Sequence, residues 1–153
     1  MSAYYQSPIG WFNIEASAVA LLKVSMVEKP TLGWLANPLE EETIAQLEAY
    51  FHGKLRQFTL PFVFSTHLSL FSRTIYHTLL DNISYGQRIS YKELSNMAGS
   101  PGAMRAVGRV MAVNPIAVII PCHRVVGTKD LGGYAWSLPR KEYLLNLELI
   151  NII

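Results

Sequence analysis

The residues best suited to chemistry in this chain surround one cysteine. Cys122 follows Pro121 and precedes His123 and Arg124, and it is the only cysteine among the 153 residues. Positive charge beside a thiol lowers its pKa and favours the nucleophilic thiolate. Glu148 lies downstream in a helical stretch, so a Cys–His–Glu set could generate such a nucleophile. A lone cysteine is more often an inert, small hydrophobic residue, and spacing by itself leaves that interpretation open.

Basic charge is concentrated in the stretch that leads to this cysteine. The whole chain has a formal net charge of only +2. Between residues 88 and 124, Glu93 is the one acidic side chain against five basic ones, which makes the stretch +4. A local basic surface on a nearly neutral protein indicates contact with a polyanion, although a solvated helix face has the same composition. The basic residues are Arg88, Lys92, Arg105, Arg109 and Arg124.

Two short helices are predicted within this basic stretch. Ser90 with Glu93 three residues later forms a capping box, which predicts a helix over residues 90–98. A turn with glycine and proline separates it from a second helix over residues 102–113. Two short helices joined by such a turn are typical of a helix-turn-helix that contacts nucleic acid, although an ordinary helical hairpin has the same pattern.

The second of these helices carries residues suited to a close, cationic contact. Arg105 and Arg109 are four residues apart and therefore share one face of the helix. Gly102 and Ala103 begin the helix with small side chains, which let another surface approach closely. Most of its other side chains are small or apolar and cannot read base edges, so a regulator that recognises one DNA sequence is disfavoured.

Further helices make the second half mostly helical. Apolar residues four apart predict an amphipathic helix over residues 68–82. Asn114 and Pro115 end the cationic helix, and the β-branched run after them is expected to be buried. A last helix over about residues 140–150 carries Glu148. The cysteine therefore follows a buried run, where a turn can present it to a cleft.

The first half is predicted to be a scaffold of short strands and one helix. Asn37 is expected to be the N-cap of the helix, with Pro38 at its first position, and Gly53 is expected to end it. Strands are predicted at residues 4–5, 11–15, 19–24 and 57–64. The aromatic side chains of this half are expected in the core: Trp11, Phe12, Trp34, Tyr50, Phe51 and Phe58.

Length and composition limit the class of protein. With 50% hydrophobic and 16% charged residues, the chain can bury a core and is not disordered. We expect an α+β fold, with a scaffold domain over residues 1–66 and a mostly helical domain over residues 67–153. No apolar run is long enough to span a membrane, so a soluble, cytoplasmic protein is expected. The single cysteine excludes an internal disulfide and a zinc site built on cysteine pairs, and we expect no metal and no cofactor.

A series of short motifs, taken in order, resembles the O6-alkylguanine-DNA alkyltransferase family. The resemblance is strong over about residues 71–149, and residues 1–66 match only in outline. The motifs are Ile89-Ser90-Tyr91, Arg105-Ala106-Val107-Gly108, Asn114-Pro115, Pro121-Cys122-His123-Arg124-Val125-Val126, Gly132-Gly133-Tyr134 and Lys141-Glu142-Tyr143-Leu144-Leu145, ending at Glu148.

The resemblance implies a fold, an activity and a partner. The fold is a small ribonuclease H-like sheet-and-helix domain followed by a helical domain with a winged-helix-like helix-turn-helix. The activity is DNA repair by irreversible, single-turnover transfer of the alkyl group from O6-alkylguanine, and from O4-alkylthymine, to Cys122. The partner is double-stranded DNA, bound through its minor groove by a monomer that flips the damaged base out of the helix.

The resemblance also implies roles for individual residues near the cysteine. His123 is expected to act as a base towards Cys122 through a bound water, and Glu148 to orient and charge-balance His123. Asn114 is expected to hold the turn between the recognition helix and the active-site loop. Tyr91 is expected to donate a proton or hydrogen bond to the departing purine.

A further set of residues is expected to bind DNA or line the pocket. Arg105 is expected to enter the base stack where the nucleotide was extruded, which offsets part of the unstacking cost. Trp136 is large, and we expect it to restrict bulky adducts if it faces the pocket rather than solvent. The expected DNA contacts are Gly102, Ala103, Arg105, Arg109, Arg124 and Tyr91. The expected pocket residues are Met111, Val125, Tyr134, Ala135 and Trp136.

Three other functions remain open from the residues themselves. A non-catalytic sensor of alkylated DNA would share the fold, but such proteins usually have another residue at the position of Cys122. A small-molecule Cys–His–Glu hydrolase would leave the helix-turn-helix without a role. A sequence-specific transcription regulator would prefer one unmodified DNA sequence.

Overall fold

The computed structural model describes residues 2–31 and 35–152, and the chain divides into two compact units. The first comprises Met1–Ser65 with Pro115–Ala117, and the second comprises Thr66–Asn114 with Val118–Ile153. The division after Ser65 lies next to the boundary expected from the sequence. The return of residues 115–117 to the first unit was not expected. Trp34, expected in the core, lies outside the described residues.

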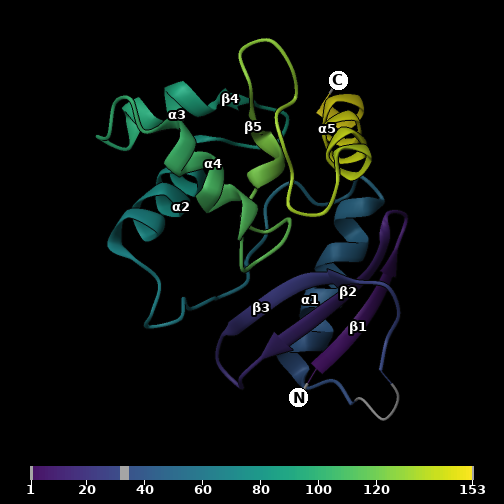
Figure 1. Cartoon of the computed structure of the whole chain (residues 1–153). Helices are drawn as coiled ribbons and strands as arrows, with labels where there is room; N and C mark the ends of the chain where they lie inside the picture. The colour runs from purple at the N-terminus through teal and green to yellow at the C-terminus, as the bar shows by residue number, and fades with distance from the viewer. Residues whose placement is uncertain (1, 32–34, 153) are drawn as a thin grey trace. The chain divides into compact units, whose positions relative to one another are not determined.

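The first unit is built on a three-stranded antiparallel sheet in the order β1-β2-β3 (Figure 1). Tyr5 pairs with Phe12 and Ser7 with Gly10, so a tight turn joins the first two strands. The third strand starts two residues later than predicted, because a turn held by the backbone of Ser17 and Ala20 precedes it. The strands are β1 (Ser2–Ser7), β2 (Gly10–Ala16) and β3 (Leu21–Val27).

The strand predicted over residues 57–64 is wrong. Among the described residues of that segment, only Phe62 forms a bridge, in parallel with Leu21. The backbone of Leu21 donates to the carbonyl of Pro61 at 2.8 Å and accepts from Val63 at 3.0 Å. Pro61 has no N–H and cannot extend the ladder, so the pairing stops after one bridge.

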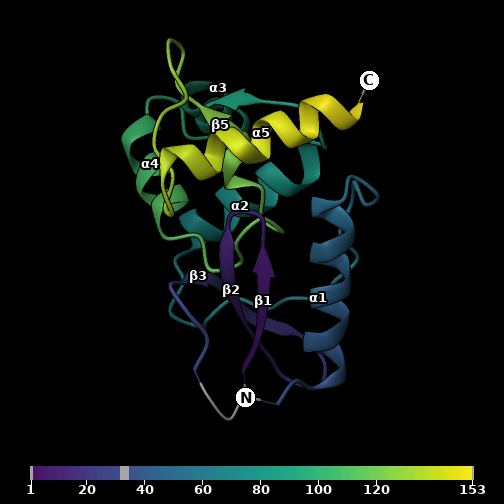
Figure 2. The same cartoon turned by 90° about the vertical axis from the view of Figure 1, so that its right-hand side faces the viewer.

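One helix, α1 (Pro38–Phe51), packs on β1 and β2, and Figure 2 shows it running alongside these strands. Asn37 caps it as predicted and accepts from the Glu40 backbone at 2.8 Å. The Glu40 carboxylate accepts in return from Asn37 at 2.9 Å and from the Ala16 backbone at 3.1 Å. Gly53 follows the helix with φ +73°, the left-handed conformation expected of a residue just past a helix end. The capped helix is therefore also fastened to its sheet.

The segment 115–117 pairs with β3 on the edge of the sheet that β2 leaves open. Val24 donates to the Pro115 carbonyl and accepts from the Ala117 backbone, both at 2.9 Å. Ile116 is fully buried, and the whole run 116–120 is buried as predicted. This segment is thereby anchored immediately before the chain reaches Cys122.

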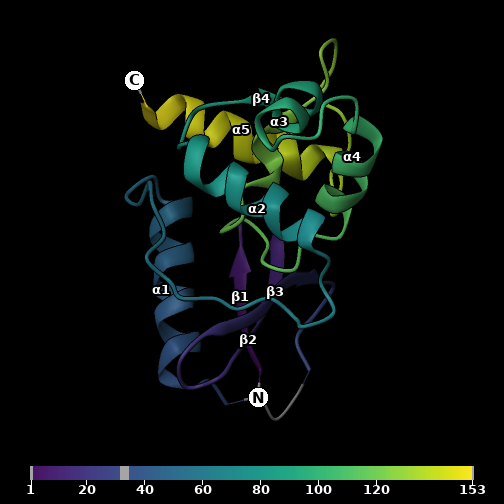
Figure 3. The same cartoon turned by 90° about the vertical axis from the view of Figure 1, so that its left-hand side faces the viewer.

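The second unit contains four helices among its described residues, and Figure 3 shows α2, α3 and α4 grouped together. Tyr76 on α2 is buried, and its hydroxyl donates to the Val110 carbonyl of α4 at 2.5 Å. The helices are α2 (Leu70–Asn82), α3 (Tyr91–Met97), α4 (Met104–Ala112) and α5 (Leu138–Ile152). A short parallel pair links β4 (Ile89–Ser90) and β5 (Val125–Val126).

Helices α3 and α4 form the predicted helix-turn-helix. Ser90 and Glu93 make the predicted capping box of α3. Helix α4 begins at Met104, two residues later than predicted, because Gly102 takes φ +82° in the turn. Buried Ser95 of α3 accepts from the Ala103 backbone at 3.0 Å, which fixes the start of α4 against α3.

No helix in the described ranges combines the length and the apolar character needed to cross a membrane.

Candidate active site

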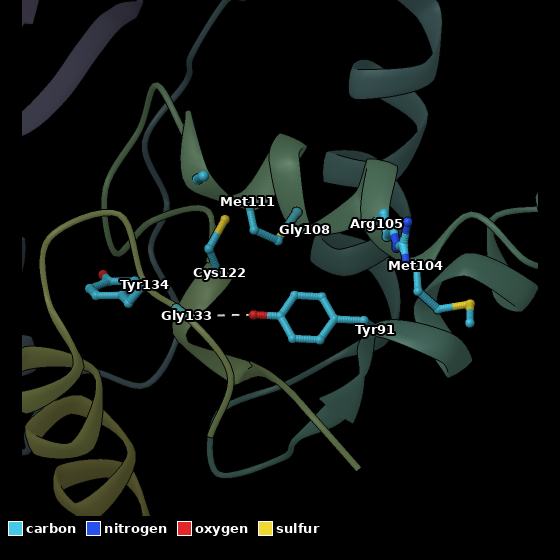
Figure 4. A pocket seen from close by; sticks show the side chains of 9 residues that line it. Tyr91, Met104, Arg105, Gly108, Met111, Cys122, Gly133 and Tyr134 are labelled. Atoms are coloured by element: carbon cyan, nitrogen blue, oxygen red, sulfur yellow. Dashed lines mark hydrogen bonds between the residues drawn. The ribbon is translucent and has the colours of Figure 1, made fainter. Parts of the chain in front are cut away.

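A cavity of about 480 Å³ opens beside Cys122 within the second unit (Figure 4). Its walls come from α3, from one face of α4, from the turn that carries Cys122 and from the loop before α5. The lining residues are Tyr91, Met104, Arg105, Gly108, Met111, Ala112, Cys122, Gly133 and Tyr134. Segments far apart in the sequence therefore meet around a single thiol.

Of the five residues predicted to line the pocket, two line this cavity and three do not. Met111 and Tyr134 line the cavity, but Val125, Ala135 and Trp136 do not. Val125 is fully buried in the short strand β5. Ala135 is exposed, and Trp136 lies edge-on against the Tyr134 ring, with 5.5 Å between ring centroids. Trp136 therefore packs against a residue of the cavity wall without lining the cavity itself.

Cys122 begins a short 3₁₀ turn, η1 (Cys122–Arg124), and its side chain is only 2% exposed. The side-chain amide of Asn114, just beyond the end of α4, donates to the Ile120 carbonyl at 2.9 Å. The Cys122 backbone donates to the same carbonyl at 2.8 Å. Asn114 thus connects the end of α4 to the turn that presents the thiol.

His123, the residue after Cys122, forms a buried pair with Glu148 of α5. Nε2 of His123 lies 2.6 Å from a Glu148 carboxylate oxygen, and the two side chains are 0% and 1% exposed. A carboxylate only accepts, so Nε2 carries the proton and Nδ1 is left as the acceptor. Nδ1 is buried and has no partner among the described residues. Burial lowers the pKa of His123 despite the opposing carboxylate, so the ring is neutral at pH 7.

Arg124, which was predicted to contact DNA, is buried inside the second unit rather than exposed on its surface. Its guanidinium is buried and donates to both oxygens of Glu148, at 2.8 and 3.1 Å, and to the Ile83 carbonyl at 3.1 Å. Burial tends to raise the pKa of Glu148, but His123 and Arg124 hold it far below its usual range. The positive charge of Arg124 is thus balanced inside the protein.

The cation that favours the thiolate is Lys141 rather than the two basic residues next to Cys122. Burial raises the pKa of the Cys122 thiol far above its usual value, against the charge of Lys141 and a hydrogen bond from Asn114. The expected effect of His123 and Arg124 on the thiol is therefore absent, because one is neutral and the other is paired with Glu148. At rest the thiol is protonated.

Lys141, on the first turns of α5, is fully buried and was missed as a site residue. Its ammonium donates to the carbonyls of Val125 at 2.6 Å and Gly133 at 2.7 Å, and it lies 5.8 Å from the Tyr91 ring centroid. Burial lowers its pKa to about 8. One side chain therefore connects the segment after the thiol to the loop across the cavity.

Tyr91 is held on the opposite wall by the same loop. Its hydroxyl donates to the Gly133 carbonyl at 3.4 Å, as the dashed line in Figure 4 shows. A Cβ on Gly132 would lie 2.7 Å from that hydroxyl oxygen, so only glycine allows this approach. Burial raises the pKa of Tyr91, so the phenol keeps its proton and is available as a donor.

The rim of the cavity is cationic where α4 begins. Arg105 lines the cavity and is exposed, and Arg109 lies one turn further along the exposed side of α4. Gly102 and Ala103 lie in the turn before the helix rather than inside it. Among the described residues, no three His, Cys, Asp or Glu side chains are grouped so that they could hold a metal ion.

Comparisons with known proteins find similarity over both units. Residues 70–150 match the family described as 6-O-methylguanine DNA methyltransferase, DNA binding domain. Residues 1–64 match the family described as 6-O-methylguanine DNA methyltransferase, ribonuclease-like domain. Together the two matches span most of the chain.

Individual relatives show the same similarity. A methylated-DNA--protein-cysteine methyltransferase from Mycobacterium leprae is 40% identical, with 96% of this chain and 91% of that protein covered. One from Methanosarcina barkeri is 44% identical over 78% and 75% of the two chains. The solved structure of Mycobacterium tuberculosis OGT in complex with DNA is 36% identical with a TM-score of 0.86, covering 97% and 92%. The chain belongs to the 6-O-methylguanine DNA methyltransferase family.

Proposed function

We propose that this protein repairs DNA by transferring the alkyl group of O6-alkylguanine to Sγ of Cys122. The observation that carries the proposal is the placement of Cys122 on the wall of a cavity that Tyr91 also lines, with the buried His123–Glu148 pair beginning at the next residue. The relatives named methylated-DNA--protein-cysteine methyltransferase support the same activity. O4-alkylthymine offers the same kind of alkyl–oxygen bond and is the second substrate we propose.

The first step converts the buried thiol into a nucleophile. His123 Nδ1 takes the thiol proton through a bound water, because Nε2 already donates to Glu148. Glu148 balances the imidazolium that forms, and its bond to Arg124 keeps it ionised. Lys141 and Asn114 stabilise the thiolate directly.

The second step moves the alkyl group. The Cys122 sulfur forms a bond to the alkyl carbon while the bond from that carbon to O6 breaks, and the electron pair passes to the purine. Tyr91 donates a proton so that guanine leaves as a neutral base, and the phenol regains a proton from solvent. An alkyl thioether is stable in water, and the family resemblance implies that each molecule acts once.

Binding to DNA follows from the cationic start of α4. The damaged atom is inaccessible inside a duplex, so the base must be flipped into the cavity at a cost of a few kcal/mol. Arg105, at the rim, enters the stack in place of the base, and Arg109 contacts the backbone along a minor groove. A monomeric protein acting on DNA in the cytoplasm remains a prediction.

The other functions considered from the sequence are less well supported. A non-catalytic sensor has no use for a thiol on the cavity wall next to a His–Glu pair. A small-molecule hydrolase would not need the cationic helix-turn-helix at the rim.

Mass spectrometry tests the proposed function. The protein in excess is mixed with a short duplex containing one O6-methylguanine, and its intact mass and Cys122 peptide are measured. We expect one added methyl on that peptide for each lesion lost, and none with Cys122→Ser. Tight binding without modification would instead support a sensor. Turnover of an ester or amide without salt-dependent DNA binding would support a hydrolase.

A further inference from the structure

One large apolar side chain at the mouth of the cavity has no part in the transfer chemistry. Met104, the first residue of α4, is 40% exposed and also lines the cavity that contains Cys122. Exposed single hydrophobic residues are common and need no explanation by themselves. Met97 on α3 is 51% exposed, but it does not line the cavity. Met104 is thus both solvent-facing and adjacent to the place that the extruded base would occupy.

The start of α4 holds Met104 in a fixed position. The Ser95 hydroxyl accepts from the Ala103 backbone at 3.0 Å and donates to the Ser100 carbonyl. Ser95 is fully buried, so these bonds are shielded from water. The first turn of α4 is therefore anchored to α3, and a rigid element positions a contact more precisely than a loop does.

Arg105 gives this apolar side chain a charged neighbour. Figure 4 shows Met104 and Arg105 extending from the same turn of α4, on the side of the cavity away from Tyr134. Arg109 continues the positive charge one turn along, and the one acid of the basic stretch, Glu93, is engaged in its capping box. A polyanion with flat apolar groups between its charges is complementary to this arrangement.

We propose that Met104 is the apolar half of a two-residue wedge, with Arg105, that enters the base stack of duplex DNA when the damaged nucleotide leaves it. Apolar side chains inserted between base steps, methionine among them, offset the cost of unstacking. The unbranched thioether of methionine adapts to irregular gaps and is attracted to aromatic faces. This inference rests on the proposed function, because it supplies the contact that stabilises the flipped state.

The wedge predicts an effect that depends on the form of the substrate. Met104→Ala should slow methyl transfer from a duplex by about tenfold, the size expected when part of a stacking contact is lost. The free base O6-methylguanine needs no flipping, so its reaction should change little. Met104→Leu keeps the apolar bulk and should restore most of the duplex rate. Met97→Ala is the matched control and should behave as wild type on both substrates.

Flipping itself is measured without the chemistry. In a Cys122→Ser background, 2-aminopurine placed at the lesion position brightens when it leaves the stack, and Met104→Ala should reduce that signal. If wild type transfers no methyl, the proposed function fails, while a 2-aminopurine signal that survives Met104→Ala overturns the wedge separately. Equal losses of transfer rate on the duplex and on the free base would also overturn the wedge. A change of oligomeric state found only in Met104→Ala would overturn it too, because Met104 would then be a contact between protein copies.

Discussion

The two units of this chain bury charge for different purposes, and two glutamates show the difference. Glu40 and Glu148 are 0% and 1% exposed. Glu40 accepts only backbone N–H groups in the described contacts, those of Asn37 and Ala16, and so fastens a helix to a sheet. Glu148 accepts from the side chains of His123 and Arg124, which lie about two dozen positions away. The first carboxylate supports structure, and in the proposed function the second supports structure and chemistry together.

The same contrast extends to the other buried polar groups. Nine polar or charged side chains are buried among the described residues, and seven of them belong to the second unit. Two of these, Asn114 and Lys141, lower the pKa of the Cys122 thiol, and three more, His123, Arg124 and Glu148, are joined in one buried network. Buried polar networks are costly when incomplete, so their concentration marks the unit where reactivity rather than stability governs the choice of residue.

The largest expected effect comes from removing the charge of Glu148. Glu148→Gln leaves Arg124 buried without a counter-charge, and we expect a loss of about 3 kcal/mol in the free energy of unfolding. Without the carboxylate the His123 imidazolium is less stable, so the rate of methyl transfer should fall by about a hundredfold. Urea unfolding and the mass of the Cys122 peptide measure the two effects.

Glu40→Gln is the matched control for this substitution. Glutamine can still accept from one of the two backbone donors, so a loss of about 1 kcal/mol in stability is expected. The rate of transfer should be unchanged.

The contribution of Glu148 to stability should depend on pH. The pKa of Glu148 is depressed in the folded protein, so the ionised carboxylate stabilises the folded state at neutral pH, and this contribution is lost as the pH falls below about 4. The difference in stability between wild type and Glu148→Gln should shrink over that range, and a constant difference would contradict the ion-pair assignment.

Lys141→Met tests whether the thiol depends on a cation outside its own motif. Loss of the ammonium should raise the pKa of Cys122 further and slow methyl transfer by about tenfold. The pH dependence of reaction with a small alkylating reagent reports the thiol titration. A pH profile identical to that of wild type would remove Lys141 from the account of thiolate formation.

The same variant has a stability signature at high pH. The folded pKa of Lys141 is about 8, below its unfolded value of about 10.4. Between these two values the unfolded chain binds more protons than the folded one, so the stability of wild type rises with pH. Lys141→Met should lack this rise, and denaturant unfolding at several pH values measures it.

How much could be predicted from the sequence follows from the range of the interactions involved. The caps at Asn37 and Ser90 and the turn at Gly53 depend on neighbouring residues, and all three were predicted. The roles of Arg124 and Lys141 depend on which distant group each one meets. Arg124 next to a cysteine suggests a surface cation, but it pairs with Glu148 on another element. Lys141 on an amphipathic helix suggests a solvated side chain, but it is buried between two carbonyls.

Gly132→Ala is expected to produce an intermediate effect, confined to the second unit. Gly132 has φ +70°, and an alanine there costs about 1–2 kcal/mol in stability. Its Cβ would also collide with the Tyr91 hydroxyl and move the proton donor, which should slow methyl transfer by about tenfold. Gly133→Ala is the control for stability, because a Cβ there meets no atom within 4 Å. Equal rates of methyl transfer in the two variants would show that the close approach to Tyr91 is unimportant.

The smallest effect is expected from a glycine of the first unit that has a similar backbone conformation. Gly53 has φ +73° just past α1, and Gly53→Ala should cost about 1 kcal/mol in the free energy of unfolding. Because Gly53 contributes nothing to the wall of the cavity, the rate of methyl transfer should match that of wild type. Gly132→Ala and Gly53→Ala thus impose comparable strain in the two units, and only the first should alter the chemistry. A rate that fell with Gly53→Ala at a temperature where the variant stays folded would show that strain in the scaffold reaches the thiol, and the division of roles between the two units would have to be abandoned.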